Sequence, residues 1–422
     1  MEQVTRNTRR KVLVITGVFP PMAIAEGDHV ARLSQGLAER GYDVDVLTST
    51  QADGATVKGC RVHAEMDNWN WASEAKILRF SADLKPDLIF IWFIGMAFEF
   101  HPMISLLPTR LKSVLPDTQV VTQITAPVGV RPKSHPFLTR AGLKLALLKV
   151  GGSYVSYEYG TILRDSDRFI AMAKPHLERF AEQMPGLEGK SVIIPPPPLI
   201  TISAPGEASR LKGREMLGVP PEAPLFAYFG RLYVGKGLEY LIRGFAKVRE
   251  QVPDARLAII GGAAPDYFKS GWSVEDLYAI ARETGVEDAI SWTGEFPFET
   301  DDGSLYLRAA DYAVLPFSEG AALNNSSIAA CAAHGLPVVT TLGERPEAEF
   351  IDGENTLLVE PKDADALAEG MLRVFRDKAL DARLRAGSAE LTDRYFSWKA
   401  TLDSTVRVFE DALQTSAMKE MA

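Results

Sequence analysis

The chain has 422 residues, of which 46% are hydrophobic and 24% charged, values typical of a soluble globular enzyme and unlike those of disordered or fibrous chains. Its 46 Lys and Arg residues against 55 Asp and Glu give a net charge of −9, which argues against a nucleic-acid partner, because such proteins carry a basic surface. The length exceeds what one hydrophobic core supports and predicts two domains, and two isolated cysteines, Cys60 and Cys331, predict a reducing compartment without disulfides.

The first half of the chain alternates between short apolar strands and helices. Residues 11–16 are predicted to form a buried strand, residues 17–27 a turn, and residues 28–40 a helix that Gly41 ends. With the next strand, predicted over 43–48, they make a βαβ unit, which implies a parallel sheet. Further strands are predicted at 88–93, 119–124, 168–172 and 191–194.

The alternation restarts after a run of four prolines at 195–198, which ends the first domain because proline continues neither a strand nor a helix. A helix is predicted over 238–251 and another over 398–413, with strands at 225–229, 256–260, 290–292, 312–315 and 337–341. The predicted divisions are therefore 1–198, 199–390 and a helical segment, 391–422. Two parallel α/β domains of this kind bind ligands at the carboxyl ends of their strands and at domain junctions.

A glycine-rich loop, Gly230–Gly237, follows the first strand of the second domain and carries two cations, Arg231 and Lys236. Glycines let backbone N–H groups approach an anion, and the helix that follows adds positive potential. Arg231 suits phosphate oxygens through its planar fork, and Lys236 supplies a compact charge. The alternative is an exposed loop with two solvated cations. The loop is not a Walker loop, since the Gly-Lys-Ser/Thr ending is missing.

A second candidate element follows the strand at 312–315 and leads into a small-residue helix over 326–334. The turn from Leu323 through Asn324, Asn325 and Ser326 has the residue types that cap helices, so the first N–H groups of that helix are available to a phosphate or a sugar. Glu319, just before the turn, accepts hydrogen bonds from sugar hydroxyls. Ordinary turn and cap chemistry explains the same residues equally well.

In this order the elements resemble the retaining, family-4-type glycosyltransferases of the GT-B fold, over nearly the whole chain. The segments that carry the resemblance are Phe19-Pro20-Pro21 with Gly27-Asp28-His29, Gly230-Arg231-Leu232 with Lys236-Gly237, Phe317-Ser318-Glu319-Gly320, Ala333-His334-Gly335-Leu336-Pro337, Asp352-Gly353-Glu354-Asn355 and Phe396-Ser397-Trp398.

The resemblance implies two facing Rossmann-like domains, with the last helix crossing back to the first domain. It also implies transfer of a sugar, with retention, from a nucleotide diphosphate-sugar in domain two to an acceptor hydroxyl in domain one, without a cofactor or a metal ion. Arg231 and Lys236 would hold the departing diphosphate and stabilise its charge, and Glu319 would bind the sugar. The remaining donor contacts implied are Gly27, Asp28, Gly230, Leu323, Asn324, Asn325 and Ser326.

The chain departs from the family where a second donor-site glutamate is usual, because Ser327 or Ala330 stands there. Asn324 and Asn325 replace two arginines found in a similar subgroup. Two alternatives therefore stay open: a non-catalytic nucleotide-sugar-binding partner, and a phosphorylase or epimerase of the same shape. The Asp-x-Asp pairs at 43/45 and 165/167 lie in or beside predicted strands and are interpreted as structural rather than metal-binding.

Residues 118–157 contain no Asp or Glu but include Arg131, Lys133, Arg140, Lys144 and Lys149. A helix over 138–150 with leucines at 138, 143, 145, 147 and 148 is either a peripheral membrane contact or a core-facing helix with a solvated basic rim. The apolar run 88–98 is too short to cross a bilayer and no signal core is visible, so the predicted location is cytoplasmic, peripheral to the inner membrane, and the acceptor a glycan, a lipid-linked sugar or a small molecule.

Three further residues receive weaker assignments. His101 follows the strand at 88–93 and is assigned to the acceptor side, whereas His29 lies on the first helix and is assigned a structural role. Phe296 and Phe298 follow the strand at 290–292 and are assigned to the nucleotide base.

Overall fold

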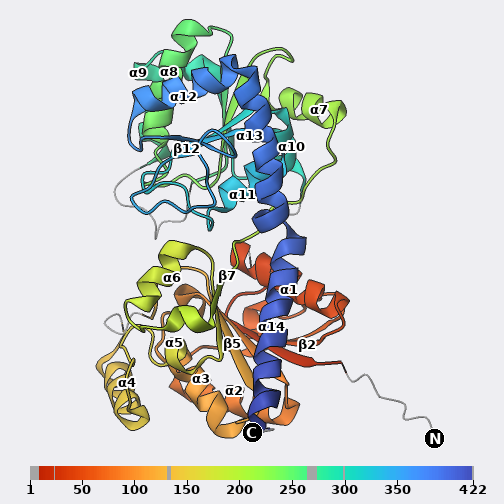
Figure 1. The fold of residues 1–422 in the computed structure, drawn as a ribbon, viewed down its shortest axis with the longest axis vertical. Coiled ribbons are helices and arrows are strands. Elements are labelled where there is room, and N and C mark those ends of the chain that lie inside the picture. Colours follow the sequence, from red (N-terminus) through yellow and green to blue (C-terminus); the bar gives the residue numbers. More distant parts are fainter. Residues whose placement is uncertain (1–8, 23, 131–134, 264–272, 298–299, 421–422) are drawn as a thin grey trace, which may run out of the picture. The chain divides into compact units, whose positions relative to one another are not determined.

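The structure, a computed structural model, describes residues 9–22, 24–130, 135–263, 273–297 and 300–420. The chain divides into two compact units, whose elements Figure 1 labels. Unit 1 comprises Met1–Ile194 with Leu402–Ala422, and unit 2 comprises Pro195–Thr401. The proline run thus opens unit 2, and the end of the chain belongs to unit 1 from Leu402.

Unit 1 is a parallel sheet with the strand order β3-β2-β1-β4-β5-β6-β7 and helices between its strands. Its elements are β1 (Lys11–Thr16), α1 (Ala25–Glu39), β2 (Asp43–Ser49), β3 (Cys60–Met66), α2 (Trp71–Leu84), β4 (Leu88–Phe93), α3 (Met103–Val114), β5 (Gln119–Ile124), α4 (Phe137–Val150), α5 (Ile162–Asp165), β6 (Arg168–Ala171), α6 (Lys174–Ala181) and β7 (Ser191–Ile193), with short 3₁₀ turns at Thr50–Ala52, Gly95–Phe98 and Leu187–Lys190.

The central strands of this sheet are buried from end to end. Every residue of β4 and β5 is buried, and β1 is buried except at Lys11. Strands covered by helices on both faces carry continuous apolar runs, which explains why these three were predicted with the bounds observed. The edge strand β3 was missed because its residues, CRVHAEM, are mostly half-exposed and form no apolar run.

The first helix starts earlier than predicted, at Ala25 instead of residue 28. Gly27 and Asp28 therefore lie in its first turn and not in a loop before it. Gly27 is buried, and a Cβ there would lie 3.4 Å from the backbone of Phe19, which is an ordinary contact distance, so space alone does not require glycine at this position.

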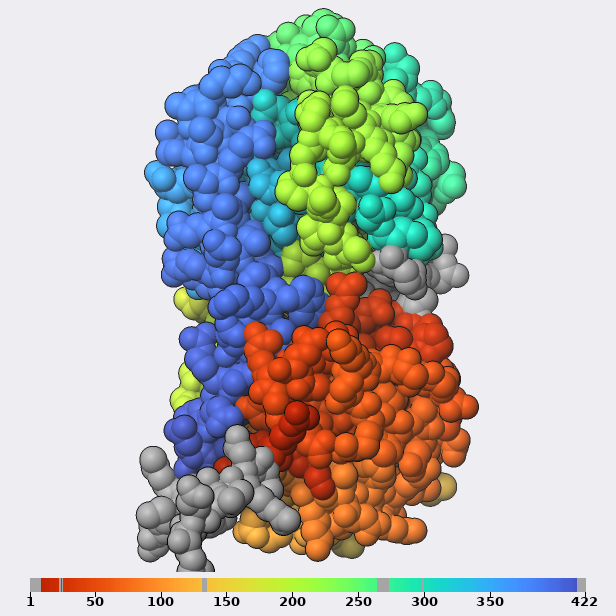
Figure 2. All heavy atoms as spheres, turned by 90° about the vertical axis from the view of Figure 1, so that its right-hand side faces the viewer, coloured from red at the N-terminus to blue at the C-terminus, as the bar shows by residue number. Residues whose placement is uncertain are grey.

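The last helix, α14 (Trp398–Glu420), packs against unit 1 from Leu402 onwards. A Cβ at Gly36 of α1 would lie 2.5 Å from the Leu402 side chain, so the glycine permits this close approach. Arg40 pairs with Asp403 at 2.7 Å, and Tyr42 Oη donates to Glu410 at 2.5 Å. Figure 2 shows this blue helix beside the red elements at the start of the chain.

Unit 2 is a second parallel sheet, with the strand order β10-β9-β8-β11-β12-β13. Its elements are α7 (Glu207–Leu217), β8 (Leu225–Phe229), α8 (Leu238–Gln251), β9 (Arg256–Ile260), α9 (Val274–Glu283), β10 (Ile290–Gly294), α10 (Asp302–Ala309), β11 (Tyr312–Leu315), α11 (Ser326–Ala333), β12 (Val338–Thr341), β13 (Leu357–Val359), α12 (Ala364–Arg376) and α13 (Lys378–Leu391), with a 3₁₀ turn at Glu287–Ala289 and a π-helical turn at Thr392–Phe396.

The strands of unit 2 all run the same way, so their carboxyl ends meet at one edge of the sheet. The loop Gly230–Gly237 leaves that edge after β8, and the turn 316–325 leaves it after the neighbouring strand β11. Among the described helices, none combines the length and the apolar character that crossing a bilayer demands.

Candidate functional site

The two elements singled out in the second half of the sequence pack directly on each other. The Ser318 N–H donates to the Gly235 carbonyl at 2.9 Å. Gly237 has a φ of 71°, and a Cβ there would lie 1.9 Å from the Pro316 carbonyl oxygen. Only glycine fits such a position, because the φ is left-handed and the space is filled by backbone. The glycine-rich loop and the turn after β11 therefore form one site.

Lys236 lies at the centre of this contact, just before α8. Its side chain is half-buried, and its ammonium nitrogen lies 4.7 Å from the ring centre of Phe317 and 4.9 Å from that of Tyr233. It makes no ion pair within the part of the chain that the structure describes. Burial lowers the pKa of Lys236 to about 8. A cation held against aromatic rings without a carboxylate, beside a helix N-terminus, is suited to an incoming anion.

Arg231, the other cation of the loop, is held differently. Its guanidinium pairs with Glu295 at 2.8 Å and reaches the Ala263 carbonyl at 3.4 Å. The side chains of Arg231 and Glu295 are 36% and 67% exposed, so this ion pair is screened by water and exchanges at low cost. The Arg231 backbone is fixed by Tyr228, whose hydroxyl donates to the Arg231 carbonyl at 3.0 Å.

The turn after β11 places Glu319 at the surface. Gly320 has a φ of 89°, and a Cβ there would lie 2.2 Å from Gly343 Cα. This turn and the loop after β12 are therefore in close backbone contact at these two glycines. Glu319 is exposed. Leu323 is buried, and its N–H donates to the carboxylate of the buried Glu347.

Asn325 occupies the N-cap position of α11, as the sequence predicted, but its side chain makes no capping hydrogen bond. Asn324 and Ser326 on either side of it are half-buried. Gly230, at the other end of the loop, approaches this helix, since a Cβ on it would lie 2.6 Å from Ser327 Oγ.

The structure thus brings together seven of the predicted site residues in unit 2: Gly230, Arg231, Lys236, Glu319, Asn324, Asn325 and Ser326. Leu323 belongs to the same turn, with its amide already occupied. Gly27 and Asp28 lie in unit 1, in the first turn of α1, where Asp28 is half-buried.

His101, assigned to the acceptor side, is 6% exposed in unit 1. Its Nδ1 accepts the N–H of Met103, the first residue of α3, at 3.1 Å, and its ring stands 5.3 Å from that of His135. Burial lowers the pKa of His101 to about 4. The imidazole is therefore neutral at pH 7 and caps a helix.

The aspartates of the two Asp-x-Asp sequences are occupied by other side chains. Asp45 accepts hydrogen bonds from Arg61 and His63, and Asp165 accepts from Arg164 and Thr109. Among the described residues, no group of three or more His, Cys, Asp or Glu is arranged to hold a metal ion.

Phe296, one of the two aromatics assigned to the nucleotide base, lies at the carboxyl edge of unit 2. Its ring stands 6.3 Å from Phe229 and 6.0 Å from Tyr306. Phe298, together with Arg131 and Lys133 of the basic segment, lies outside the described residues.

Sequence reasoning missed two glutamates of the site. Glu295 follows β10 and pairs with Arg231 across two strands, and no spacing in the sequence marks that contact. Glu347 stands in the polar run GERPEAEF, where nothing distinguishes it from its exposed neighbours, yet it is 1% exposed. The burial of an acidic residue in a polar run can be predicted only when the turn that covers it is known.

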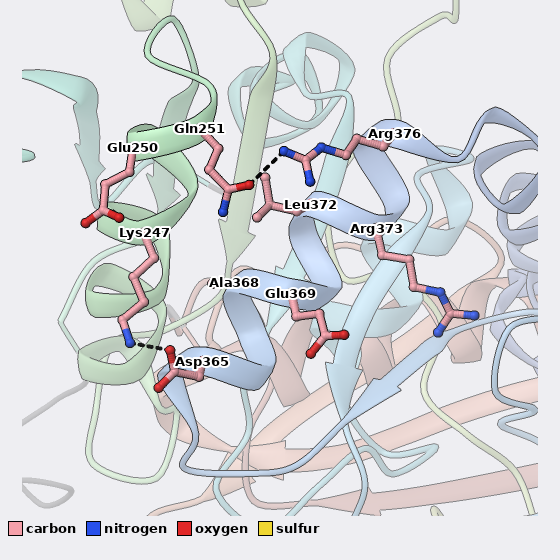
Figure 3. Close-up of a pocket in the computed structure, with 9 residues that line it drawn as sticks. All are labelled: Lys247, Glu250, Gln251, Asp365, Ala368, Glu369, Leu372, Arg373 and Arg376. Atoms are coloured by element: carbon pink, nitrogen blue, oxygen red, sulfur yellow. Dashed lines mark hydrogen bonds and ion pairs between the residues drawn. The ribbon is translucent and has the colours of Figure 1, made fainter.

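A hollow of about 700 Å³ between α8 and α12 is separate from this site (Figure 3). Its lining residues include both acidic and basic side chains, with Lys247 bonded to Asp365 and Arg376 bonded to Gln251. The residues that α8 contributes to it, Lys247, Glu250 and Gln251, lie on the second half of that helix, and the others lie on α12. The glycine-rich loop adjoins the start of α8, which is about 21 Å long at 1.5 Å per residue. The groove therefore contributes nothing to the loop.

Residues 223–377 match the family described as Glycosyl transferases group 1. The matched stretch contains Arg231, Lys236 and Glu319. This stretch is a group 1 glycosyltransferase domain. Over its length, the chain is 27% identical to D-inositol 3-phosphate glycosyltransferase from Acidothermus cellulolyticus, with 98% of this chain and 94% of the relative covered. It spans less than two thirds of three other relatives with the same name, at 57%, 66% and 56% of their lengths.

Solved structures of other proteins share the fold of nearly the whole chain. Sucrose-phosphate synthase from Thermosynechococcus elongatus superimposes with a TM-score of 0.67 at 20% identity, covering 96% of this chain and 100% of that one. HepE from Anabaena, in complex with UDP and glucose, superimposes with a TM-score of 0.66 at 15% identity, covering 96% and 100%. The chain has the GT-B fold, as predicted, with two Rossmann-like sheets.

Proposed function

We propose that the protein is a retaining, metal-independent glycosyltransferase that moves a sugar from a nucleotide diphosphate-sugar to an acceptor hydroxyl. The observation that carries this proposal is the environment of Lys236. Its half-buried ammonium makes no ion pair among the described residues, and its loop packs on the turn that leads into a helix. Keeping a cation in such a place costs free energy, which an anionic ligand recovers.

The chemistry follows from the positions of the two cations. Breaking a sugar–phosphate bond builds negative charge on the departing diphosphate, and fixed cations beside it lower the barrier. Lys236 meets the diphosphate without giving up an ion pair with any described residue, whereas Arg231 first exchanges Glu295 for phosphate oxygens. Glu319, exposed at the same edge, accepts hydrogen bonds from sugar hydroxyls and orients the anomeric carbon.

The relatives support the donor class. HepE, which shares the fold, was solved with UDP and glucose bound, and the relatives named D-inositol 3-phosphate glycosyltransferase transfer a glycosyl group. In the proposal, the glycine-rich loop of this chain binds the diphosphate of such a donor. The acceptor is a glycan, a lipid-linked sugar or a small molecule, and the enzyme works in the cytoplasm, at the membrane surface.

A thermal-shift panel of nucleotide diphosphate-sugars tests the donor site. A ligand at one hundred times its Kd adds about 2.7 kcal/mol to the free energy of unfolding, so the true donor raises Tm by about 5–10 °C. The matched variant is Arg231→Ala with Lys236→Ala, which should lose the shift. If no nucleotide raises Tm, the proposal fails.

Turnover assays with the donor so found then separate the activities. Transfer that requires an added hydroxyl acceptor supports the proposal, and the product's anomeric configuration tests retention. Turnover that needs only inorganic phosphate identifies a phosphorylase, and sugar conversion without any acceptor identifies an epimerase. Binding without turnover identifies a non-catalytic partner, an alternative that is favoured by Ser327 or Ala330 at the position of the family's second glutamate.

A further inference from the structure

Helix α4 of unit 1 presents an apolar stripe to solvent. Leu138, Leu145 and Leu148 are 80%, 55% and 70% exposed, and Phe137 at the start of the helix is 72% exposed. With the exposed Ala141, the positions 138, 141, 145 and 148 follow the three- and four-residue spacing of a single helix face. Water-facing leucines in a row are unusual on a soluble domain and mark an interaction surface.

The opposite side of the same helix holds it on the domain. Leu143 and Ala146 are buried against Leu106, with Leu147 and Trp71 packed around them, in a small cluster apart from the main core. The leucines of this helix therefore divide between two faces. A core-facing helix with a solvated basic rim, one of the two sequence interpretations, accounts for the inner face but not for the outward stripe.

Cations flank the stripe on both sides. At 100° per residue, Arg140 and Lys144 lie along one margin of the outward leucines and Lys149 along the other, and all three are exposed. No acidic residue occurs between 118 and 157 in a protein whose net charge is −9. Exposed Tyr154 and Tyr157 follow shortly after the helix, and tyrosine is enriched where membranes meet water.

We infer that α4 lies flat on an anionic lipid bilayer, with Leu138, Leu145 and Leu148 inserted among the acyl chains and Arg140, Lys144 and Lys149 on the lipid phosphates. An apolar stripe edged by cations is the pattern of helices that lie in the membrane interface. This gives a defined surface to the membrane contact of the proposed function, and it holds or fails independently of the transfer reaction.

The charges favour a bilayer over a second copy of the chain. In a symmetric pair formed through α4, the same patch meets itself, so the cations of one stripe would face the cations of the other. One acidic residue beside α4, Glu74, lines the hollow of about 350 Å³ next to this helix and is already paired with Arg110 at 3.3 Å. It offers little to a partner's lysines.

Flotation with lipid vesicles tests the inference on the full chain. The protein should float with vesicles of phosphatidylglycerol and phosphatidylcholine at low salt, and much less with phosphatidylcholine alone or at high salt. Each basic residue near an anionic surface is worth about a fivefold change in partitioning, so Lys144→Gln with Lys149→Gln should weaken binding about 30-fold. Leu145→Gln with Leu148→Gln should weaken it at least as much.

Matched substitutions on another helix complete the test. Leu211 and Met216 on α7 are 43% and 39% exposed, so Leu211→Gln with Met216→Gln removes a similar apolar area from unit 2 and should leave flotation unchanged. All variants should keep the wild-type Tm and the same Tm shift with nucleotide. The inference is overturned if the wild-type protein ignores anionic vesicles, if the α4 and α7 variants behave alike, or if the α4 substitutions convert a dimer into monomers without changing flotation.

Discussion

Lys236 and the cations of α4 are basic residues in an acidic protein, but their surroundings differ completely. Lys236 is half-buried over two aromatic rings, and burial lowers its pKa to about 8. Arg140, Lys144 and Lys149 are exposed along an apolar stripe. The first arrangement favours one compact anion at close range, because a partly desolvated charge interacts strongly. The second favours an extended anionic surface and weakens with salt.

The largest effect is expected from removing the buried cation. Lys236→Ala should lower kcat/KM for sugar transfer by about 100- to 1,000-fold, because it deletes a preorganised charge beside the departing diphosphate. Lys247→Ala, on the helix α8 that follows the loop, is the control, because Lys247 is 44% exposed and paired with Asp365, and it should change kcat/KM by less than about twofold. If the two substitutions lowered kcat/KM equally, the half-buried Lys236 would have no greater role in transfer than the exposed Lys247.

The packing that seats Lys236 is the next target. Gly237→Ala forces a left-handed φ on alanine and drives its Cβ into the Pro316 carbonyl, so the free energy of unfolding should fall by about 2–3 kcal/mol. Gly235 also has a positive φ, of 96°, but has nothing within 4 Å of its would-be Cβ. Gly235→Ala should therefore cost only about 1 kcal/mol. Urea unfolding curves measure both, and similar losses would show that the contact with Pro316 is loose.

The lowered pKa of Lys236 predicts opposite pH trends for binding and stability. Below pH 8 the ammonium is charged; above it, nucleotide affinity should fall about tenfold per pH unit. Because the unfolded chain holds this proton more tightly, the contribution of Lys236 to the free energy of unfolding should instead rise between pH 8 and 10. Calorimetric titration and urea unfolding of the wild type against Lys236→Arg check both signs. An affinity that falls equally in the arginine variant would assign the pH dependence to another group.

The smallest effect is expected from breaking the ion pair between Arg231 and Glu295. Glu295→Gln removes its carboxylate partner, so nucleotide affinity should rise about two- to fivefold, the range that an exposed ion pair is worth. Asp288→Asn breaks the exposed pair with Arg249 and is the matched control, for which no change is expected. Weaker nucleotide binding by Glu295→Gln would mean that the carboxylate itself contacts the ligand.

The sequence predicted those features that depend on burial of apolar residues and on the backbone conformations of glycine. The central strands and α8 were predicted with their observed bounds, because continuous apolar runs and a helical period leave little freedom. The glycines at 230 and 237 mark the candidate loop in the sequence, and both have the positive φ that admits few other residues. The pairing of Arg231 with Glu295 could not be predicted, because it joins residues on strands that are neither consecutive nor adjacent. The outward leucines of α4 could not be separated from the inward ones until the face turned to the core was known.

The α4 stripe also has a consequence for the protein in dilute buffer, away from any lipid. An exposed apolar stripe favours self-association, and the repulsion among Arg140, Lys144 and Lys149 opposes contact between the stripes of two molecules. Added salt screens that repulsion while leaving the hydrocarbon attraction intact. Purified protein should therefore cluster reversibly as ionic strength rises, and mild detergent should disperse it.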